Sequence, residues 1–207
     1  MNEVRVERVT VAGRAGFMFA GDEAPQVLFA PVLPEDAPRL RVGMTQLSSM
    51  SRYFRFLSDV EELSERQIEH FTHPDQVGHV AWGALDASRP GLDGLGLGRM
   101  IRETGERRVA EMALAVIDAA QGRGVGRVLL AVLLARAEAL ALDEVHAWVA
   151  PENRKVIGWF GALGARWSRG DEPWEARFAL PYVAPADSAV GQRLATTIAA
   201  VRDVVNA

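Results

Sequence analysis

The chain has 207 residues, of which 49% are hydrophobic and 24% are charged, and its net charge is −4 at pH 7. This composition suits one globular domain with its own core and argues against a basic, nucleic-acid-binding surface. Cysteine is absent, which excludes disulfides, thiolate metal sites and cysteine nucleophiles. Because no apolar stretch resembles a signal peptide or a membrane span, we expect a cytoplasmic protein that binds neither membrane nor nucleic acid.

The first quarter of the chain predicts a hairpin followed by a strand and helices. Residues 1–25 alternate apolar and polar side chains around a glycine-containing turn, which is typical of a β-hairpin. Residues 26–32 read as a strand. Helices are expected over 34–46 and 48–57, and a further one begins after Ser64, since Ser64 and Gln67 have the spacing of a capping box.

The rest of the chain predicts a sheet whose last strands alternate with helices. Three strands separated by turn residues form a meander, and a helix, a strand, a second helix and two further strands follow. The meander strands are expected at 79–86, 95–103 and 109–117, and the later strands at 144–150, 165–169 and 175–180. This order predicts a mixed α/β (α+β) fold.

The last segment, residues 183–207, forms a tail with apolar residues at helical spacing: Val190, Leu194, Ile198, Val201 and Val205. It predicts an amphipathic helix that packs on the domain or on a second copy in a homodimer. The expected organisation is a hairpin extension at 1–25, a domain at 26–182 and this tail.

A glycine-rich stretch, Gln121-Gly122-Arg123-Gly124-Val125-Gly126, stands between a strand and a helix. Glycines allow close backbone approach, and the free N–H groups at a helix start attract anions, so a diphosphate is the natural ligand. A P-loop would need lysine and Ser or Thr after the last glycine, and a Rossmann fingerprint has other spacing and follows a βαβ strand rather than a meander. An ordinary helix start with packing glycines is the remaining alternative.

The positions of Gln121, Gly124 and Gly126 match the Gln/Arg-x-x-Gly-x-Gly/Ala signature, and the stretch resembles the GNAT superfamily of N-acetyltransferases. The resemblance implies a mixed, mostly antiparallel central sheet flanked by helices and acetyl-CoA as co-substrate, without a metal. It also implies that backbone groups bind the pantetheine arm and the pyrophosphate, with an asparagine near the thiol end. The residues concerned are Ala115, Val116, Ile117, Gln121, Gly122, Arg123, Gly124, Val125, Gly126, Arg127 and Asn153.

A narrower resemblance covers Leu47-Ser48-Ser49-Met50-Ser51-Arg52-Tyr53-Phe54-Arg55-Phe56 and Leu63-Ser64-Glu65-Arg66. These segments are similar to the substrate-side helices of bacterial protein lysine acetyltransferases. The resemblance implies a primary amine as acceptor, on a protein lysine or on a small molecule. Arg52 and Arg55 could contact an acidic substrate, or they could be solvated residues of an amphipathic helix.

Glu111 is the candidate general base, because removal of a proton activates an amine for attack on a thioester. It lies in the strand before the glycine loop, where partial burial beside Met112 and Leu114 is expected. It could instead be a solvated glutamate paired with Arg107 or Arg108. The resemblance places a tyrosine acid seven residues after Asn153, and this chain has Phe160 there.

The sequence therefore favours an acetyl-CoA-dependent N-acetyltransferase that works by direct attack in a ternary complex, since it has no cysteine for an acetyl-enzyme. A non-catalytic acyl-CoA-binding sensor or partner protein with the same fold is the alternative. His70 and His73 have the spacing of a metal pair, but no third ligand is evident, so loop or capping roles are expected for them.

Overall fold

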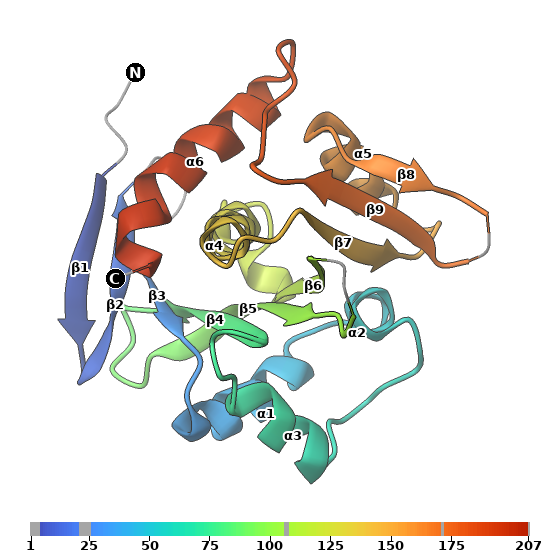
Figure 1. Ribbon diagram of the computed structural model, residues 1–207. Helices are drawn as coiled ribbons and strands as arrows, with labels where there is room; N and C mark the ends of the chain where they lie inside the picture. The colour runs from blue at the N-terminus through green and yellow to red at the C-terminus, as the bar shows by residue number, and fades with distance from the viewer. Residues whose placement is uncertain (1–4, 21–25, 106–107, 171, 207) are drawn as a thin grey trace.

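The computed structural model describes residues 5–20, 26–105, 108–170 and 172–206 (Figure 1). Its centre is a nine-stranded sheet in the order β1-β2-β3-β4-β5-β6-β7-β9-β8, antiparallel except for the parallel pair β6–β7. The strands are β1 Arg5–Val11, β2 Arg14–Ala20, β3 Val27–Pro31, β4 His79–Asp86, β5 Asp93–Arg102, β6 Val109–Val116, β7 Glu144–Val149, β8 Arg166–Ser168 and β9 Trp174–Ala179.

Six α-helices flank this sheet: α1 Ala37–Thr45, α2 Ser49–Phe56, α3 Glu65–Thr72, α4 Val125–Ala139, α5 Arg154–Ala162 and α6 Ala189–Val205. Two short 3-10 turns, η1 Pro34–Asp36 and η2 Asp118–Ala120, precede α1 and α4. Figure 1 shows α4 and α6 on one face of the sheet and α1 and α3 on the other. The predicted mixed fold and its mostly antiparallel sheet are confirmed.

Helix α4 occupies the centre of the main core. Ten of its fifteen residues are buried, because it packs on β4, β5 and β6 with one side and on α6 with the other. A helix covered on two sides is apolar nearly all round. Leu129 and Leu133 have no exposed surface, and the core continues into Met100 and Met112 of the sheet.

The antiparallel meander of β4, β5 and β6 is confirmed, but the expectation that the strand before the glycine loop belongs to no β–α–β unit was wrong. β6 pairs with β5 antiparallel, as expected, but it also pairs with β7 in parallel, so that β6, α4 and β7 form a β–α–β crossover. Turn residues mark the β4–β5 and β5–β6 connections in the sequence, whereas the second partner of β6 depends on where the chain returns after α4. The β6–β7 pairing stops at Glu111 opposite His146, and the sheet opens beyond it.

The hairpin β1–β2 extends the sheet, since β2 pairs with β3, and α6 contacts both α4 and β1. Four of the five expected apolar residues of the tail are buried in the core: Leu194, Ile198, Val201 and Val205. Val190 is 43% exposed, which contradicts the expected stripe, because it lies in the first turn of α6 beyond the edge of α4.

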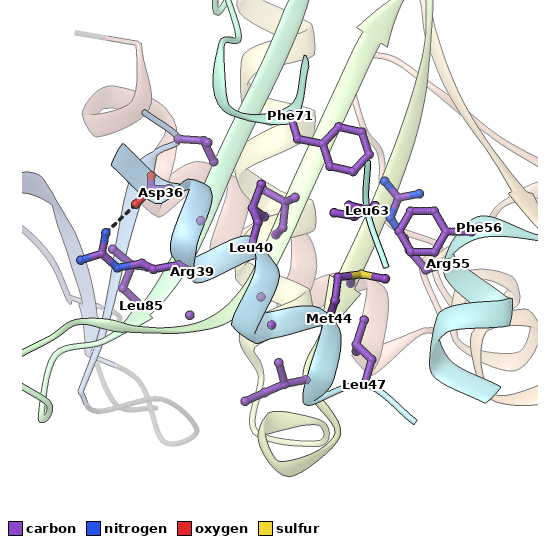
Figure 2. A pocket seen from close by; sticks show the side chains of 18 residues that line it. Asp36, Arg39, Leu40, Met44, Leu47, Arg55, Phe56, Leu63, Phe71 and Leu85 are labelled. Atoms are coloured by element: carbon purple, nitrogen blue, oxygen red, sulfur yellow. Dashed lines mark hydrogen bonds and ion pairs between the residues drawn. The ribbon is translucent and has the colours of Figure 1, made fainter. Parts of the chain in front are cut away.

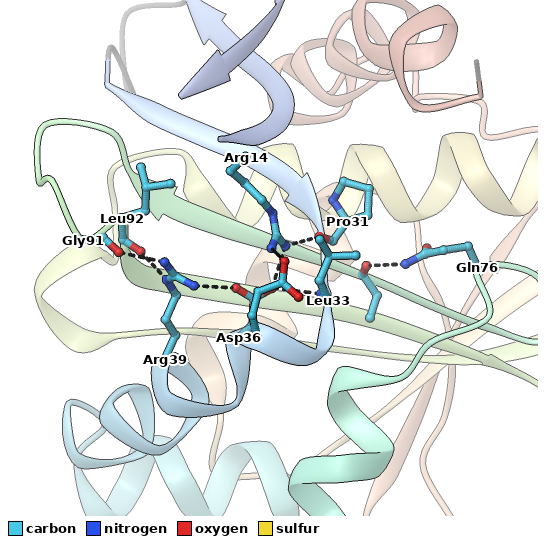
Figure 3. Close-up of polar contacts among 10 residues, drawn as sticks. Arg14, Pro31, Leu33, Asp36, Arg39, Gln76, Gly91 and Leu92 are labelled. Carbon is cyan, nitrogen blue, oxygen red and sulfur yellow. Dashed lines mark hydrogen bonds and ion pairs between the residues drawn. The ribbon is translucent and has the colours of Figure 1, made fainter. Parts of the chain in front are cut away.

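An ion-pair network at Asp36 joins the hairpin to α1 (Figure 3). The Asp36 carboxylate accepts hydrogen bonds from Arg14 Nη2 at 2.6 Å, from the Leu33 amide at 2.9 Å and from Arg39 Nη1 at 3.0 Å. Arg39 also donates to the carbonyls of Leu92 and Gly91, each at 2.8 Å. These contacts fix the start of α1 against β2 and against the turn between β4 and β5.

Candidate functional site

A cleft of about 490 Å³ lies where β6 and β7 diverge. Its walls come from α2, the end of β6, the glycine loop with the start of α4, α5, and the start of α6. Residues from five separate parts of the chain therefore meet at one opening in the sheet. They are Leu47, Ser51, Phe54, Arg55, Leu114, Ala115, Val116, Ala120, Gln121, Gly122, Gly124, Gly126, Arg127, Asn153, Lys155, Val156, Trp159, Val190 and Arg193.

The glycine loop forms the floor of the cleft at the start of α4. Gly122 has φ 75° and Gly124 has φ 80°, a left-handed conformation that disfavours residues with a Cβ. Gly124 is the N-cap of α4, and its carbonyl accepts the Val128 amide at 3.1 Å. The preceding amides of the first turn have no partner within the helix, so they and the positive end of the helix dipole can hold an anion.

The open edge of β6 supplies further backbone groups. The Ile117 amide donates to the Leu95 carbonyl on the β5 side at 3.0 Å. Because N–H directions alternate along a strand, the amides of Leu114 and Val116 point the other way, into the opening. Of the backbone groups expected to pair with a cofactor, the Ile117 amide is already bonded to β5. The sequence does not show this parity until the register with β5 is known.

Gln121 connects the loop to its surroundings through its side chain. Its Nε2 donates to the Val116 carbonyl at 3.3 Å and to Asp118 Oδ1 at 3.2 Å, and its Oε1 accepts from Lys155 Nζ at 3.1 Å. The signature glutamine thus fixes the end of β6 and orients the only lysine of the chain beside the cleft.

Asp118 attaches α2 to the same region. Its carboxylate accepts hydrogen bonds from the Ser51 hydroxyl at 2.7 Å and from the Ser48 amide at 3.2 Å, and these bonds lower its pKa below the ordinary value. Ser48 is the N-cap of α2, so the capped end of this helix stands at the mouth of the cleft. The acidic residue is therefore ionised at neutral pH and holds the substrate-side helix against η2.

The wall formed by α5 differs in part from the expectation. Asn153 does line the cleft, and its Oδ1 caps α5 by accepting the Val156 amide at 3.2 Å. Phe160, at the position where the resemblance puts a tyrosine, is buried and packs edge-to-face on Phe178 with ring centroids 5.2 Å apart. The aromatic side chain that α5 contributes to the cleft is its neighbour Trp159.

Glu111 lies on the face of the sheet that carries α1–α3, and it is not among the residues that line the cleft. Its side chain is exposed, so the expected partial burial was wrong. Along the strand, four residues separate Glu111 from Ala115, which is roughly 13 Å.

Two arginines next to Glu111 are partly shielded from water. Burial lowers the pKa of Arg55 and of Arg99 to about 10, and the Glu111 charge opposes this shift in both cases. Arg55 contacts the rings of Phe56 and Phe71 at 5.0 and 6.0 Å from their centroids, and it lines the cleft. Both guanidinium groups remain charged at neutral pH, so they create a positive field beside Glu111.

The histidine pair His70 and His73 does not form a metal site. His70 stacks on His79, with centroids 4.9 Å apart, and both lie near Arg99, whose Nε donates to His79 Nε2 at 3.3 Å. Within the described residues no group of three or more potential metal ligands was found. His73 instead contacts the Glu69 carbonyl at the end of α3 through Nδ1.

The cleft brings together most of the predicted residues: Ala115, Val116, Gln121, Gly122, Gly124, Gly126, Arg127 and Asn153. Ile117, Arg123 and Val125 do not line it. The side chain of Arg123 is exposed, and that of Val125 is buried in the core. Sequence reasoning missed Trp159, Val190 and Arg193, because no local motif signals that the starts of α5 and α6 reach the opening.

The family model described as the acetyltransferase (GNAT) family matches residues 46–165, more than half of the chain. The chain belongs to the GNAT family of acetyltransferases. This matched region contains α2, the strands from β4 to β7, the glycine loop and α5, so it includes all the residues that line the cleft except Val190 and Arg193 of α6.

Among relatives of this GNAT protein, acetyltransferase Pat of Mycolicibacterium smegmatis is 30% identical over 141 residues, which are 68% of this chain and 41% of Pat. The chain thus spans less than half of that relative. The GNAT domain of S. lividans PAT has a TM-score of 0.68 at 28% identity, covering 84% of this chain and 97% of that domain.

The fold is also that of Salmonella typhimurium yncA, whose structure contains its cofactor acetyl-CoA. The TM-score is 0.58 at 14% identity, over 79% of this chain and 99% of yncA. Within the described part of this GNAT chain, no helix combines the length and the apolar character needed to cross a membrane.

Proposed function

We propose that this GNAT protein transfers an acetyl group from acetyl-CoA to a primary amine by direct attack in a ternary complex. The observation that carries the proposal is the opening between β6 and β7, where free strand amides and the first amides of α4 converge on one cleft. The acceptor is a protein lysine or a small-molecule amine. The domain that performs this reaction is residues 26–182.

The chain's residues fit the parts of acetyl-CoA in a definite order. The amides at the start of α4, helped by the helix dipole, match the pyrophosphate. Lys155 and Arg127 line the same part of the cleft and carry positive charge towards it. The backbone of Leu114 and Val116 matches the pantetheine arm, which can pair with the open strand edge in the manner of an added strand.

The thioester then lies beside Leu114 and Ala115, at the inner end of the open edge. An amide N–H of β6 at this point polarises the thioester carbonyl and stabilises the oxyanion that forms when the amine attacks. Asn153 keeps its role as helix cap and orients its amide group at the wall of the cleft. No cysteine takes part, because the chain has none.

Glu111 acts as the base for the amine through intervening water, because its carboxylate is exposed and some distance from the open edge. Arg55 and Arg99 lie near Glu111 and place two positive charges on the side from which the amine reaches it. The amine loses its proton towards Glu111, and the thiolate of CoA is protonated by water or by a cleft residue such as Lys155.

A non-catalytic acyl-CoA-binding protein is the second candidate, and one observation favours it. No tyrosine lines the cleft. The hydroxyl of Tyr182 donates to the Leu163 carbonyl at 3.0 Å, and Phe160 is buried away from the cleft. Such a protein would bind acetyl-CoA without transferring its acetyl group, so that no free CoA would form.

The test is the release of free CoA from acetyl-CoA, measured with a panel of free amines, amino acids and lysine peptides. Acceptor-dependent release above the rate of spontaneous hydrolysis is the expected result. Saturable binding of acetyl-CoA with no release on any amine would support the sensor instead, and absence of binding would contradict both.

A further inference from the structure

A second, smaller cavity lies on the other side of β6, beneath α1, and nothing in the acetyl transfer described above uses it (Figure 2). Its volume is about 90 Å³. Helices α1 to α3 contribute its roof and sides, and strands β4, β5 and β6 form its floor. The apolar residues around it are Val32, Leu40, Met44, Leu47, Phe56, Leu63, Phe71, Leu85, Leu97, Ala115 and Ile117.

The roof of this cavity is fixed at both ends. At its start, α1 is attached through Asp36 and through Arg39, which donates to the carbonyls of Leu92 and Gly91. At its far end, the Gln46 carbonyl accepts the Asp118 amide at 3.4 Å. Because both ends are attached, α1 cannot settle onto the sheet to close the space below its middle.

The floor and the roof both lack side chains where they face each other. Gly83 and Gly94 lie on the sheet, and Gly43 lies on α1 above them. A Cβ at Gly83 would have its nearest neighbours at 3.9 Å, and a Cβ at Gly43 would meet nothing within 4 Å. The space therefore results from three glycines and is not left by a poorly fitting side chain.

The apolar residues of the three helices form a cluster of their own. Met44, Leu47, Leu63, Ile68 and Phe71 pack together, and within the described residues this cluster stays separate from the main core around α4. Protein interiors are normally filled to high density, so an unfilled apolar space between two clusters indicates room for an apolar ligand.

The cavity adjoins the cofactor cleft, since Leu47, Arg55 and Ala115 line both. Ala115 is also the residue beside which the proposed function places the thioester. The small methyl side chain of Ala115 lies on the α1 face of β6. The side chain of Leu97, opposite it on β5, lies on the same face of the sheet. A chain that continues from the thioester carbonyl has a direct path past Ala115 into the cavity.

We propose that this cavity receives the acyl chain of an acyl-CoA longer than acetyl-CoA, with about four carbons. The inference rests on the proposed function and adds a substrate class to it. In the reaction, the amine nitrogen bonds to the acyl carbonyl carbon and the carbon–sulfur bond breaks. CoA leaves as thiolate and takes up one proton, while the amine loses one, so the products are an N-butyryl amide and CoA.

The apolar lining selects against charged acyl groups. Asp36 and Arg39 at one end neutralise each other through their ion pair at 3.0 Å. Arg55 lies where the cavity meets the cleft. Its guanidinium group contacts the Phe56 ring, and the charge of Glu111 opposes the lowering of its pKa by burial. A terminal carboxylate would have to leave water to enter this space, whereas a methyl group gains by leaving water.

Burial of each additional methylene should raise affinity about three- to fourfold, so butyryl-CoA, with two more methylenes, should bind about tenfold more tightly than acetyl-CoA. A pocket of this size admits only a few heavy atoms, and octanoyl-CoA should lose the advantage.

The test compares the wild-type chain with Gly83→Val and Gly43→Leu, each of which projects a side chain into the cavity. Gly161→Leu is the matched control, because Gly161 lies exposed on α5, lines neither cavity, and has nothing within 4 Å of its Cβ position. Calorimetry without acceptor gives the affinities for acetyl-, butyryl- and succinyl-CoA. Steady-state kinetics with one amine gives kcat/KM for the same three.

Expected is a roughly tenfold butyryl preference in both readouts for the wild type and Gly161→Leu. In Gly83→Val and Gly43→Leu the preference should disappear while acetyl-CoA affinity stays within about twofold. Equal affinities for butyryl- and acetyl-CoA in the wild type would overturn the proposal. So would a butyryl preference that survives in both cavity variants, or tighter binding of succinyl-CoA. A chain that binds no acyl-CoA at all would refute the proposed function together with this inference.

Discussion

The two cavities on either side of β6 are built in opposite ways. In the cofactor cleft, one continuous stretch, residues 114–127, supplies nine of the nineteen lining residues, including three glycines and the open edge of a strand. The acyl cavity is made of apolar side chains from α1, α2, α3 and three strands, and of glycines distant from each other in the sequence. A local sequence motif therefore predicts the cofactor cleft, whereas no motif predicts the acyl cavity.

The largest effect on acetyl-CoA affinity is expected from a substitution in the glycine loop of the cofactor cleft. Gly126→Glu would place a carboxylate where the pyrophosphate binds, and its Cβ has ordinary contacts of 3.8 Å with Trp159 and Val116. Affinity for acetyl-CoA should fall by about 100-fold or more through repulsion and lost space. Gly126→Ala is the steric control and should lose much less. Isothermal titration calorimetry measures both.

Gly124→Glu is a weaker test of the same idea, because Gly124 has φ 80° and any side chain there strains the backbone. Its loss of binding would not separate strain from repulsion. Normal acetyl-CoA binding by folded Gly126→Glu would remove the glycine loop from the cofactor site.

The next largest effect concerns the base. Glu111→Gln should lower turnover about 100-fold at neutral pH, within the usual range for a general base, and leave acetyl-CoA affinity unchanged. The loss should shrink in alkaline buffer, because a lysine amine with a pKa near about 10.4 then deprotonates without help. Rate profiles between pH 7 and pH 10 on the true acceptor measure this.

The control for that measurement is Glu65→Gln, which removes an exposed carboxylate paired only with Arg41. It should change neither rate nor profile. A Glu111→Gln loss that stays constant up to pH 10 would assign a positioning role to Glu111, and an unchanged rate at neutral pH would exclude it from the mechanism.

A smaller effect concerns the pH dependence of fold stability, at the place where His79 of β4 stacks on His70 of α3. Burial and the nearby Arg99 charge lower the pKa of His79 to about 4, from an ordinary value of 6.5. The unfolded chain binds this proton first as the pH falls, so stability is complete above pH 6.5 and decreases as the pH falls towards 4. The contribution of His79 between pH 7.5 and pH 5 is on the order of 2 kcal/mol.

Urea unfolding at these two pH values should therefore show a smaller pH dependence for His79→Gln than for the wild type. His73→Gln changes an exposed histidine at the end of α3 and should retain the full dependence. If both variants lose stability with pH as the wild type does, His79 is not the group that responds.

The smallest effect belongs to the acyl cavity. Gly43→Ala removes a glycine from the last turn of α1 and adds a methyl group in open space. Helix propensity alone predicts a gain of about 0.5–1 kcal/mol in the free energy of unfolding, which thermal or urea denaturation can detect. A loss of stability would mean that the space below α1 is already filled.

Much of the fold was predictable because its signals are local. The capping box at Ser64, the helical spacing in α4 and the turn residues between the meander strands all depend on neighbours in the chain. The parallel partner of β6 was not predictable from the meander, since it depends on where the crossover returns. The burial of Val190 was predicted wrongly for a related reason. Helical spacing identifies the apolar face of α6, but it does not show at which residue that face extends beyond the core.

In the site, the residues found in advance are those of the glycine loop. The residues that were missed or misjudged are those whose position in the site depends on which way a backbone amide or a side chain points. Ile117 and Val116 differ only in which side of the strand their amides face, and the aromatic residue at the cleft is Trp159 where spacing pointed to Phe160. The placement of Arg55 and Arg99 next to Glu111 requires the register of β5 with β6 and the position of α2 on them, which no motif encodes.

The central claim is that the open edge of β6 pairs with acetyl-CoA, and NMR of the backbone amides tests it most directly. Amide exchange and chemical shifts are recorded with and without saturating acetyl-CoA. The account predicts new protection and large shifts at Leu114 and Val116, with Ala115 and Ile117 already protected before the ligand is added. Saturable binding that leaves the Leu114 and Val116 amides in fast exchange would contradict it.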